Sequence, residues 1–90
     1  MTTVPQEAQD LLCAAVRSFV RNPAAVSVSV GAVDDGEVLL VIRAADDDIG
    51  RVIGRDGQHI KALRLLALSV GAQLGLRVHV GVAGSRVQAP

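Results

Sequence analysis

Residues 54 to 57, with the sequence GRDG, form the part of the chain best suited to bind an anion. Glycine at positions 54 and 57 permits a positive φ and leaves no Cβ to keep another backbone away. The helical pattern that follows would direct its free amide groups and the positive end of its dipole toward this turn. A phosphodiester could therefore lie against the turn, with the guanidinium of Arg55 as an additional charged donor.

Further basic and polar residues flank the turn. Arg51, Lys61 and Arg64 are its nearest basic neighbours in the sequence, and Gln58 begins the following helix. Lys61 and Arg64 are three residues apart, so they share one helical face. We expect Arg51, Arg55, Lys61 and Arg64 to contact phosphate. An exposed, solubilising role fits Arg64 equally well.

Other chemistries find little support in the sequence. No Gly-Lys-Ser or Gly-Lys-Thr follows the glycines, which excludes a P-loop, and no nucleophile with a neighbouring base can be proposed. His59 and His79 are isolated, and Cys13 has no base near it in the sequence. We interpret Asp46 to Asp48 as capping a short helix, because consecutive carboxylates on a helix point in different directions and do not converge on a metal. We expect no enzymatic activity, cofactor or metal.

Composition limits the chain to one small domain. It has 90 residues, of which 50% are hydrophobic, and its single aromatic residue, Phe19, is expected in a core of aliphatic side chains. Nine basic and nine acidic residues give a formal charge of zero, so there is no overall basic field, and nucleic-acid binding would depend on local geometry. One cysteine and the absence of a basic leader or a long apolar run favour a cytoplasmic protein that does not enter membranes.

The apolar periodicity predicts the order helix, strand, strand, helix, helix, strand. The helices are expected at 5–21, at a short segment ending near 52, and at 58–74, and the strands at 26–30, 37–43 and 76–80. Asp34 to Gly36 predicts a hairpin turn, and the two-helix crossover predicts that the last two strands are parallel. The fold class is therefore α+β, with a three-stranded mixed sheet and three helices on one face. We expect a single domain over 1–82 and a disordered tail over 83–90.

The string from Val52 to Ile60, VIGRDGQHI, resembles the KH-domain signature, in which an apolar residue and Ile precede Gly-x-x-Gly-x-x-Ile. The order of elements resembles the type II KH fold, whose extra helix and strand precede the core. The resemblance extends over about residues 4 to 82. In length and in its single KH unit, the chain resembles the KhpA family of small bacterial RNA-binding proteins.

This resemblance implies that about four nucleotides of single-stranded RNA lie in a groove, with their backbone held at the GRDG turn. Ile49, Ile53 and Ile60 would form one wall, and the sheet edge with the loop at 31–36 would form the other. Asp56 departs from the family pattern, which often has a basic or neutral residue at this position. Its carboxylate would repel phosphate, and the acidic residues of the loop would add to that repulsion. The resemblance further implies a role in post-transcriptional regulation or as an RNA chaperone, and a homodimer or a heterodimer with a larger KH-containing RNA-binding protein.

A second function stays open from the residues alone. Leu65, Leu66 and Leu68 broaden the apolar surface of the long helix beyond one stripe, and the chain has no net charge. Exposed apolar patches mark interaction surfaces. The alternative is therefore a protein-interaction or dimerisation module with little or no intrinsic RNA affinity.

Overall fold

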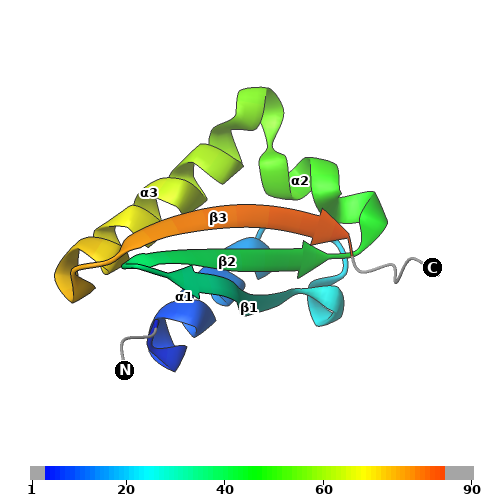
Figure 1. The fold of residues 1–90 in the computed structure, drawn as a ribbon. Coiled ribbons are helices and arrows are strands. Elements are labelled where there is room, and N and C mark those ends of the chain that lie inside the picture. Colours follow the sequence, from blue (N-terminus) through cyan, green and yellow to red (C-terminus); the bar gives the residue numbers. More distant parts are fainter. Residues whose placement is uncertain (1–3, 85–90) are drawn as a thin grey trace.

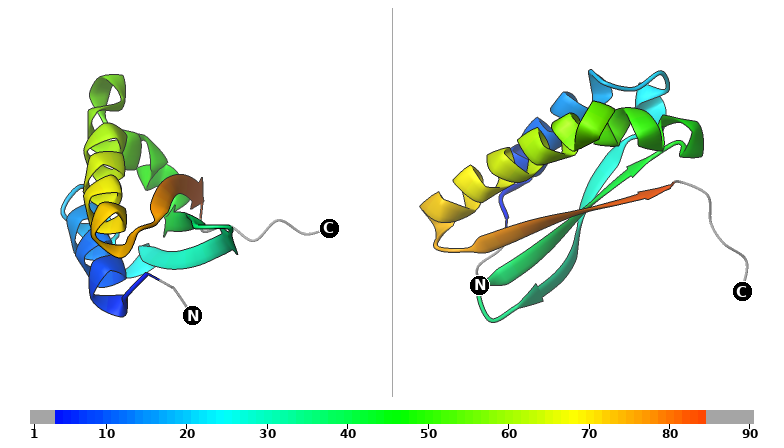
Figure 2. Two further views of the ribbon diagram at one scale, coloured as in Figure 1. Left: turned by 60° about the vertical axis from the view of Figure 1, so that its left-hand side comes forward. Right: turned by 90° about the horizontal axis from the view of Figure 1, so that it is seen from above.

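A three-stranded sheet carries all the helices on one of its faces (Figure 1). The computed structural model describes residues 4–84. The elements follow in the order α1 (Gln6–Arg17), β1 (Ser27–Asp34), β2 (Glu37–Ala44), α2 (Ile49–Ile53), α3 (Gln58–Leu74) and β3 (Arg77–Gly84). Short 3-10 turns precede β1, α2 and α3. The predicted α+β class and the order of elements are confirmed, and Figure 2 shows that the helices form one layer against the sheet.

The sheet has the predicted mixed topology. Its strand order is β1-β2-β3, with β1 antiparallel and β3 parallel to the central strand. Val38, Leu40, Ile42 and Ala44 alternate along β2 and are all buried, because this face lies under the helices. The parallel pairing of β2 and β3 follows from the two-helix crossover between them.

A single aliphatic core lies between the sheet and the helices. Helix α1 contributes Ala8, Leu12 and Val16, and α3 contributes residues at helical spacing from Ile60 onward. Its buried hydrophobic residues are Val4, Ala8, Leu12, Val16, Val26, Val38, Leu40, Ile42, Ala44, Val52, Ile60, Leu63, Ala67, Val78 and Val80. Phe19 is not among them but is half-buried at the margin, so its prediction as a core residue was only partly right.

Several predicted boundaries shift. Helix α1 ends at Arg17 instead of 21, and residues after its end contact Asp48 and His59. Strand β1 does not stop at Gly31 but passes through a bulge there and ends at Asp34. Strand β3 reaches Gly84, two residues beyond the predicted domain end. The remaining residues of the predicted tail, 85–90, lie outside the described part of the chain.

Candidate nucleic-acid interface

The GRDG turn joins α2 to α3 in a left-handed backbone conformation. Gly54 has φ 80° and ψ 168°, Asp56 has φ 56° and ψ 23°, and Gly57 has φ 73° and ψ 20°. Residues other than glycine rarely adopt such values, but aspartate and asparagine tolerate the left-handed helical region better than most. Asp56 is therefore compatible with its backbone, whereas the extended, positive-φ conformation of Gly54 is restricted essentially to glycine.

Gly54 is also required by packing inside the protein. A Cβ built at this position would lie 2.7 Å from Cγ of His59 and 2.9 Å from the backbone nitrogen of His59. At Gly57 the nearest atoms to such a Cβ are the side chains of Ile60 at 3.7 Å and Lys61 at 3.9 Å. The space on the Cβ side of Gly54 is thus filled by His59, so packing within the protein by itself requires a glycine at this position. A Cβ at Gly57 would make only ordinary van der Waals contacts.

The His59 ring connects the start of α3 to α2 and to the segment that follows α1. Its Nδ1 lies 2.7 Å from the carbonyl oxygen of Arg51, and because a carbonyl only accepts, Nδ1 carries the hydrogen. The ring also stacks on Phe19, with a centroid separation of 3.9 Å and an interplanar angle of 9°. These contacts fix the first turn of α3 against α2 and against the segment that follows α1.

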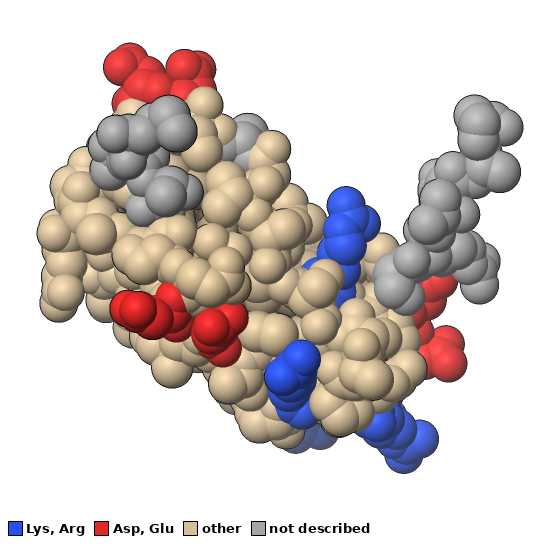
Figure 3. All heavy atoms as spheres, turned by 90° about the horizontal axis from the view of Figure 1, so that it is seen from below, with Lys and Arg blue, Asp and Glu red and all other residues tan. Residues whose placement is uncertain are grey.

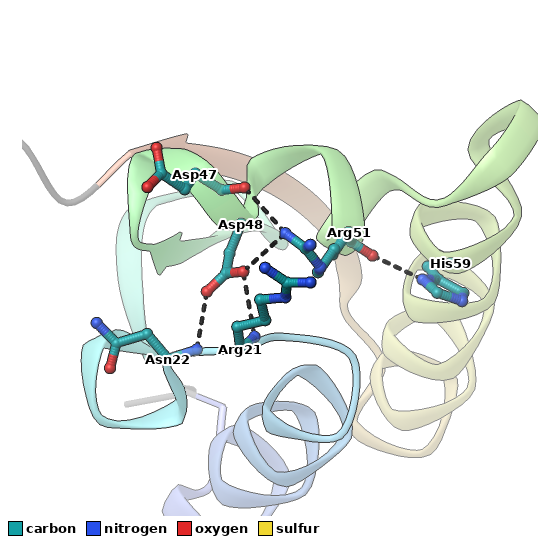
Figure 4. A network of polar contacts seen from close by, with 6 residues as sticks. All are labelled: Arg21, Asn22, Asp47, Asp48, Arg51 and His59. Atoms are coloured by element: carbon teal, nitrogen blue, oxygen red, sulfur yellow. Dashed lines mark hydrogen bonds and ion pairs between the residues drawn. The ribbon is translucent and has the colours of Figure 1, made fainter.

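Asp48 anchors the segment after α1 to the start of α2. Its carboxylate accepts the backbone N–H groups of Arg21 and Asn22 at 3.1 and 3.0 Å, and its Oδ1 pairs with Nη1 of Arg51 at 3.3 Å (Figure 4). The bond from the Arg21 amide is the largest cause that lowers the pKa of Asp48, and the Asn22 amide and the Arg51 guanidinium act in the same direction against the effect of burial. The predicted side-chain cap is absent: Asp48 binds the segment after α1 instead of the amides of its own helix.

Exposure differs among the basic residues expected at the turn. Arg55, Lys61 and Arg64 are exposed, and none forms an ion pair with another described residue. Arg51 is only partly exposed, because its guanidinium pairs with Asp48 and donates to the carbonyl oxygen of Asp47 at 3.2 Å. Three of the four cations are thus available to an anion, and the charge of the fourth is largely compensated.

The predicted apolar wall is only partly accessible. Ile53 is 40% exposed, Ile49 is half-buried against the core, and Ile60 is 8% exposed. Ile60 therefore packs the start of α3 against the core and offers little exposed surface to a nucleotide base. Gln58, the first residue of α3, is exposed beside the turn.

The loop at 31–36 does not face the turn, so this part of the predicted groove is wrong. Asp35 and Gly36 line a surface hollow with Gly75 and Leu76, and the backbone N–H of Arg77 donates to the carbonyl oxygen of Gly36 at 2.9 Å. These residues lie at the C-terminal end of α3, and the 17 residues of that helix separate them from the turn. This length corresponds to roughly 25 Å, about three Debye lengths at physiological salt, so the acidic loop barely affects an anion at the turn.

The zero net charge conceals a separation of charge between the two ends of the fold. The end with the turn carries the cations Arg17, Arg21, Arg43, Arg51, Arg55, Lys61 and Arg64, together with Asp46, Asp47, Asp48 and Asp56. The opposite end carries Glu7, Asp10, Asp34, Asp35 and Glu37, with Arg77 as its cation among the described residues. On the face in Figure 3, the blue side chains lie in the middle and on the right, with red side chains also at the right-hand edge, whereas the charged side chains on the left are all red. This separation was missed because the composition gives only the total.

Three residues that pack around the turn or next to α2 were not identified as such from the sequence. His59 had no visible partner, Phe19 was assigned to the core, and Arg21 was treated as part of α1. Phe19 and His59 are 40 positions apart, and no local pattern signals their stacking.

Within residues 4–84, no group of three or more His, Cys, Asp or Glu side chains is placed to hold a metal ion. No described helix is long and apolar enough to cross a membrane.

Comparison with known proteins identifies relatives over most of the chain. The family described as KhpA/KhpB, KH domain, matches residues 9–82. The RNA-binding protein KhpA of Streptomyces coelicolor is 41% identical over 63 residues, which are 70% of this chain and 77% of that protein. The RNA-binding protein KhpA of Leifsonia xyli is 43% identical over 67 residues, 74% of this chain and 84% of that protein.

A solved structure shares the fold at lower sequence similarity. The crystal structure of Era from Aquifex aeolicus, bound to GDP and aluminium fluoride, superposes with a TM-score of 0.64 and 17% identity. The match covers 92% of this chain and 32% of that protein. At this identity, the similarity concerns the fold alone.

Proposed function

The chain belongs to the KhpA/KhpB family of KH-domain proteins, and on this premise we propose that it is a noncatalytic RNA-binding protein whose GRDG turn contacts the phosphate backbone. It would hold short single-stranded segments and serve in post-transcriptional regulation or as an RNA chaperone. The relatives named above are RNA-binding proteins, and this chain shares the fold over nearly its full described length.

The left-handed turn at the start of α3 is the observation that carries the proposal. Gly57 is the N-cap of this helix of 17 residues, and no side chain caps its amide groups. The positive end of the helix dipole therefore faces a turn that also presents the unpaired guanidinium of Arg55. Contacts of this kind position a nucleic-acid backbone without reading its sequence, so we expect low sequence specificity.

Neutralising the turn tests the proposal directly. Arg55→Gln should weaken binding of a labelled oligouridylate in fluorescence anisotropy and reduce the slope of log affinity against log salt by about 0.7, the value for one phosphate contact on a single strand. Arg77→Gln is the matched control, because it removes the same charge from an exposed residue at the opposite end of the fold. Equal behaviour of the two variants, or no binding by the unaltered protein, would contradict the proposal.

Asp56 offers a test in the opposite direction. Asparagine tolerates the left-handed conformation that this position adopts, so Asp56→Asn removes the carboxylate with little backbone strain. We expect tighter RNA binding, by about two- to fivefold at low salt, since an exposed charge near phosphate contributes less than about 1 kcal/mol. Unchanged or weaker binding would place the phosphate away from this turn.

An interaction module is the second candidate, supported by apolar residues on the outer side of α3. Leu65 is 65% exposed and Leu68 is 55% exposed, one helical turn apart. Two adjacent exposed leucines on a regular helix favour contact with a second copy of the chain or with the KH domain of a larger protein. A dimer would place two weak RNA sites together and raise avidity without new contacts, so the two candidate functions are compatible.

Light scattering after size-exclusion chromatography tests this candidate. The unaltered protein should elute as a dimer at about 100 μM, and Leu65→Gln combined with Leu68→Gln should elute as a monomer, because each change puts an amide in the apolar contact. Leu11→Gln, at a residue of α1 that is 51% exposed, is the control. A monomer at every concentration without the substitutions would restrict the surface to a different partner.

A further inference from the structure

We propose that RNA held at the GRDG turn continues onto the corner between α1 and α2, where the side chain of Arg21 contacts a further phosphate. The inference rests on the proposed function and extends it, because it assigns the protein a binding path longer than the four nucleotides expected of a KH groove. The ligand is single-stranded RNA of more than four nucleotides, recognised through its backbone.

A continuous series of contacts leads from the turn to this corner. His59 fills the space beside Gly54, stacks on Phe19 and binds the carbonyl of Arg51. Arg51 in turn pairs with Asp48, which holds the backbone of Arg21. The surface between the turn and Arg21 is therefore formed by side chains fixed to one another, and a bound strand would cross ordered groups on this path.

The charges at the corner leave one cation without a partner. Oδ1 of Asp48 accepts both the backbone N–H of Arg21 and the Nη1 of Arg51, so one buried carboxylate lies between two arginines. The Asp48 carboxylate forms its ion pair with the guanidinium of Arg51, whereas the guanidinium of Arg21 forms no ion pair within the described chain. Figure 4 shows the Arg21 side chain extending toward Arg51, while the Asp47 carboxylate points away from both. Two guanidinium groups thus lie near one paired carboxylate, which leaves the positive charge of Arg21 without an ion-pair partner among the described residues.

A phosphate group is the anion best suited to pair with the guanidinium of Arg21. A guanidinium beside a second, compensated guanidinium attracts an anion with several acceptor oxygens, and the adjoining turn is already the proposed site for the RNA backbone. The opposite end of the fold is acidic and would repel the strand. A strand leaving the turn toward α1 thus meets attraction, whereas one that follows α3 to its C-terminal end meets carboxylates.

Binding of oligouridylates of four and ten nucleotides tests the inference in fluorescence anisotropy over several salt concentrations. Arg21→Gln should weaken binding of the ten-nucleotide RNA by about three- to tenfold and lower its salt slope by about 0.7, the change expected for one lost phosphate contact. Binding of the four-nucleotide RNA should not change, because that RNA ends at the turn. Arg21→Lys should retain most of the affinity, and Arg77→Gln should bind both RNAs as the unaltered protein does.

The outcomes separate this inference from the proposed function. If Arg55→Gln weakens both RNAs while Arg21→Gln weakens neither, the path over Arg21 is refuted and the turn remains. If Arg21→Gln weakens both lengths equally, or Arg77→Gln matches it, the effect is one of overall charge and the path is again refuted. If no RNA binds, both proposals fail. The backbone amide of Arg21 survives the substitution, so the bond to Asp48 and the unfolding temperature should be retained.

Discussion

Replacing the two turn glycines by alanine should have unequal effects, because only one of them is confined by a neighbour. At Gly57 the cost is the left-handed backbone, about 1–2 kcal/mol for a residue with a Cβ. At Gly54 the conformation is restricted essentially to glycine and costs about 1–3 kcal/mol. Its new Cβ would also lie within 2.9 Å of two atoms of the His59 ring and of the His59 backbone nitrogen, and such overpacking adds about 1–3 kcal/mol.

The total for Gly54→Ala is therefore about 2–6 kcal/mol, a large part of the roughly 5–13 kcal/mol expected for a domain of this size. Urea unfolding followed by far-ultraviolet circular dichroism gives the free energy of unfolding of each variant. Combining Gly54→Ala with His59→Ala should cost less than the sum of the single changes, because the ring no longer collides with the new Cβ. Rescue should be incomplete, since the His59 backbone nitrogen stays in place.

Two results would refute this reasoning. One is an equal cost for Gly54→Ala and Gly57→Ala, which would mean that only backbone conformation matters. The other is additivity of the substitutions at Gly54 and His59, which would mean that the ring does not occupy the space beside the glycine. Gly50→Ala is the control, because a Cβ there meets no atom within 4 Å inside α2. It should leave stability unchanged or raise it by up to about 1 kcal/mol.

Three further predictions concern individual contacts. Hydrogen bonds lower the pKa of Asp48, so the stability that its carboxylate gives the fold is complete above the ordinary pKa and is lost as the pH falls through the lower folded value. Asp48→Asn should therefore reduce the unfolding temperature at pH 7, and the unfolding temperature of the variant should decline less steeply below pH 4. The pKa of Glu37 is lowered chiefly by its hydrogen bond with His79, but both side chains are exposed, so Glu37→Gln should leave the unfolding temperature at pH 7 within error. Phe19→Leu removes the stack on His59, and should broaden or shift the amide resonances of the turn in nuclear magnetic resonance spectra while retaining most of the core.

The sequence by itself determined the fold class and the place of the turn. An apolar run on both faces predicted β2 as a central strand, and helical spacing predicted α3 with its observed ends, because each pattern reflects which sides of the element are buried. Gly54 and Gly57 marked the junction of two helices, and the length of the crossover predicted the parallel pairing of β2 and β3. These features depend on residues close together in the chain.

Only the tertiary structure decided which groups surround the turn. Phe19 reaches His59, and Asp48 reaches the amides of Arg21 and Asn22, across more than 25 positions of sequence. The acidic hairpin lies far from the turn for the same reason, since its distance is fixed by the length and direction of α3. Contacts between distant segments depend on how complete elements pack, and no local pattern of residue types encodes that packing. The sequence therefore located the proposed phosphate site, and the fold set its neighbours and its charge.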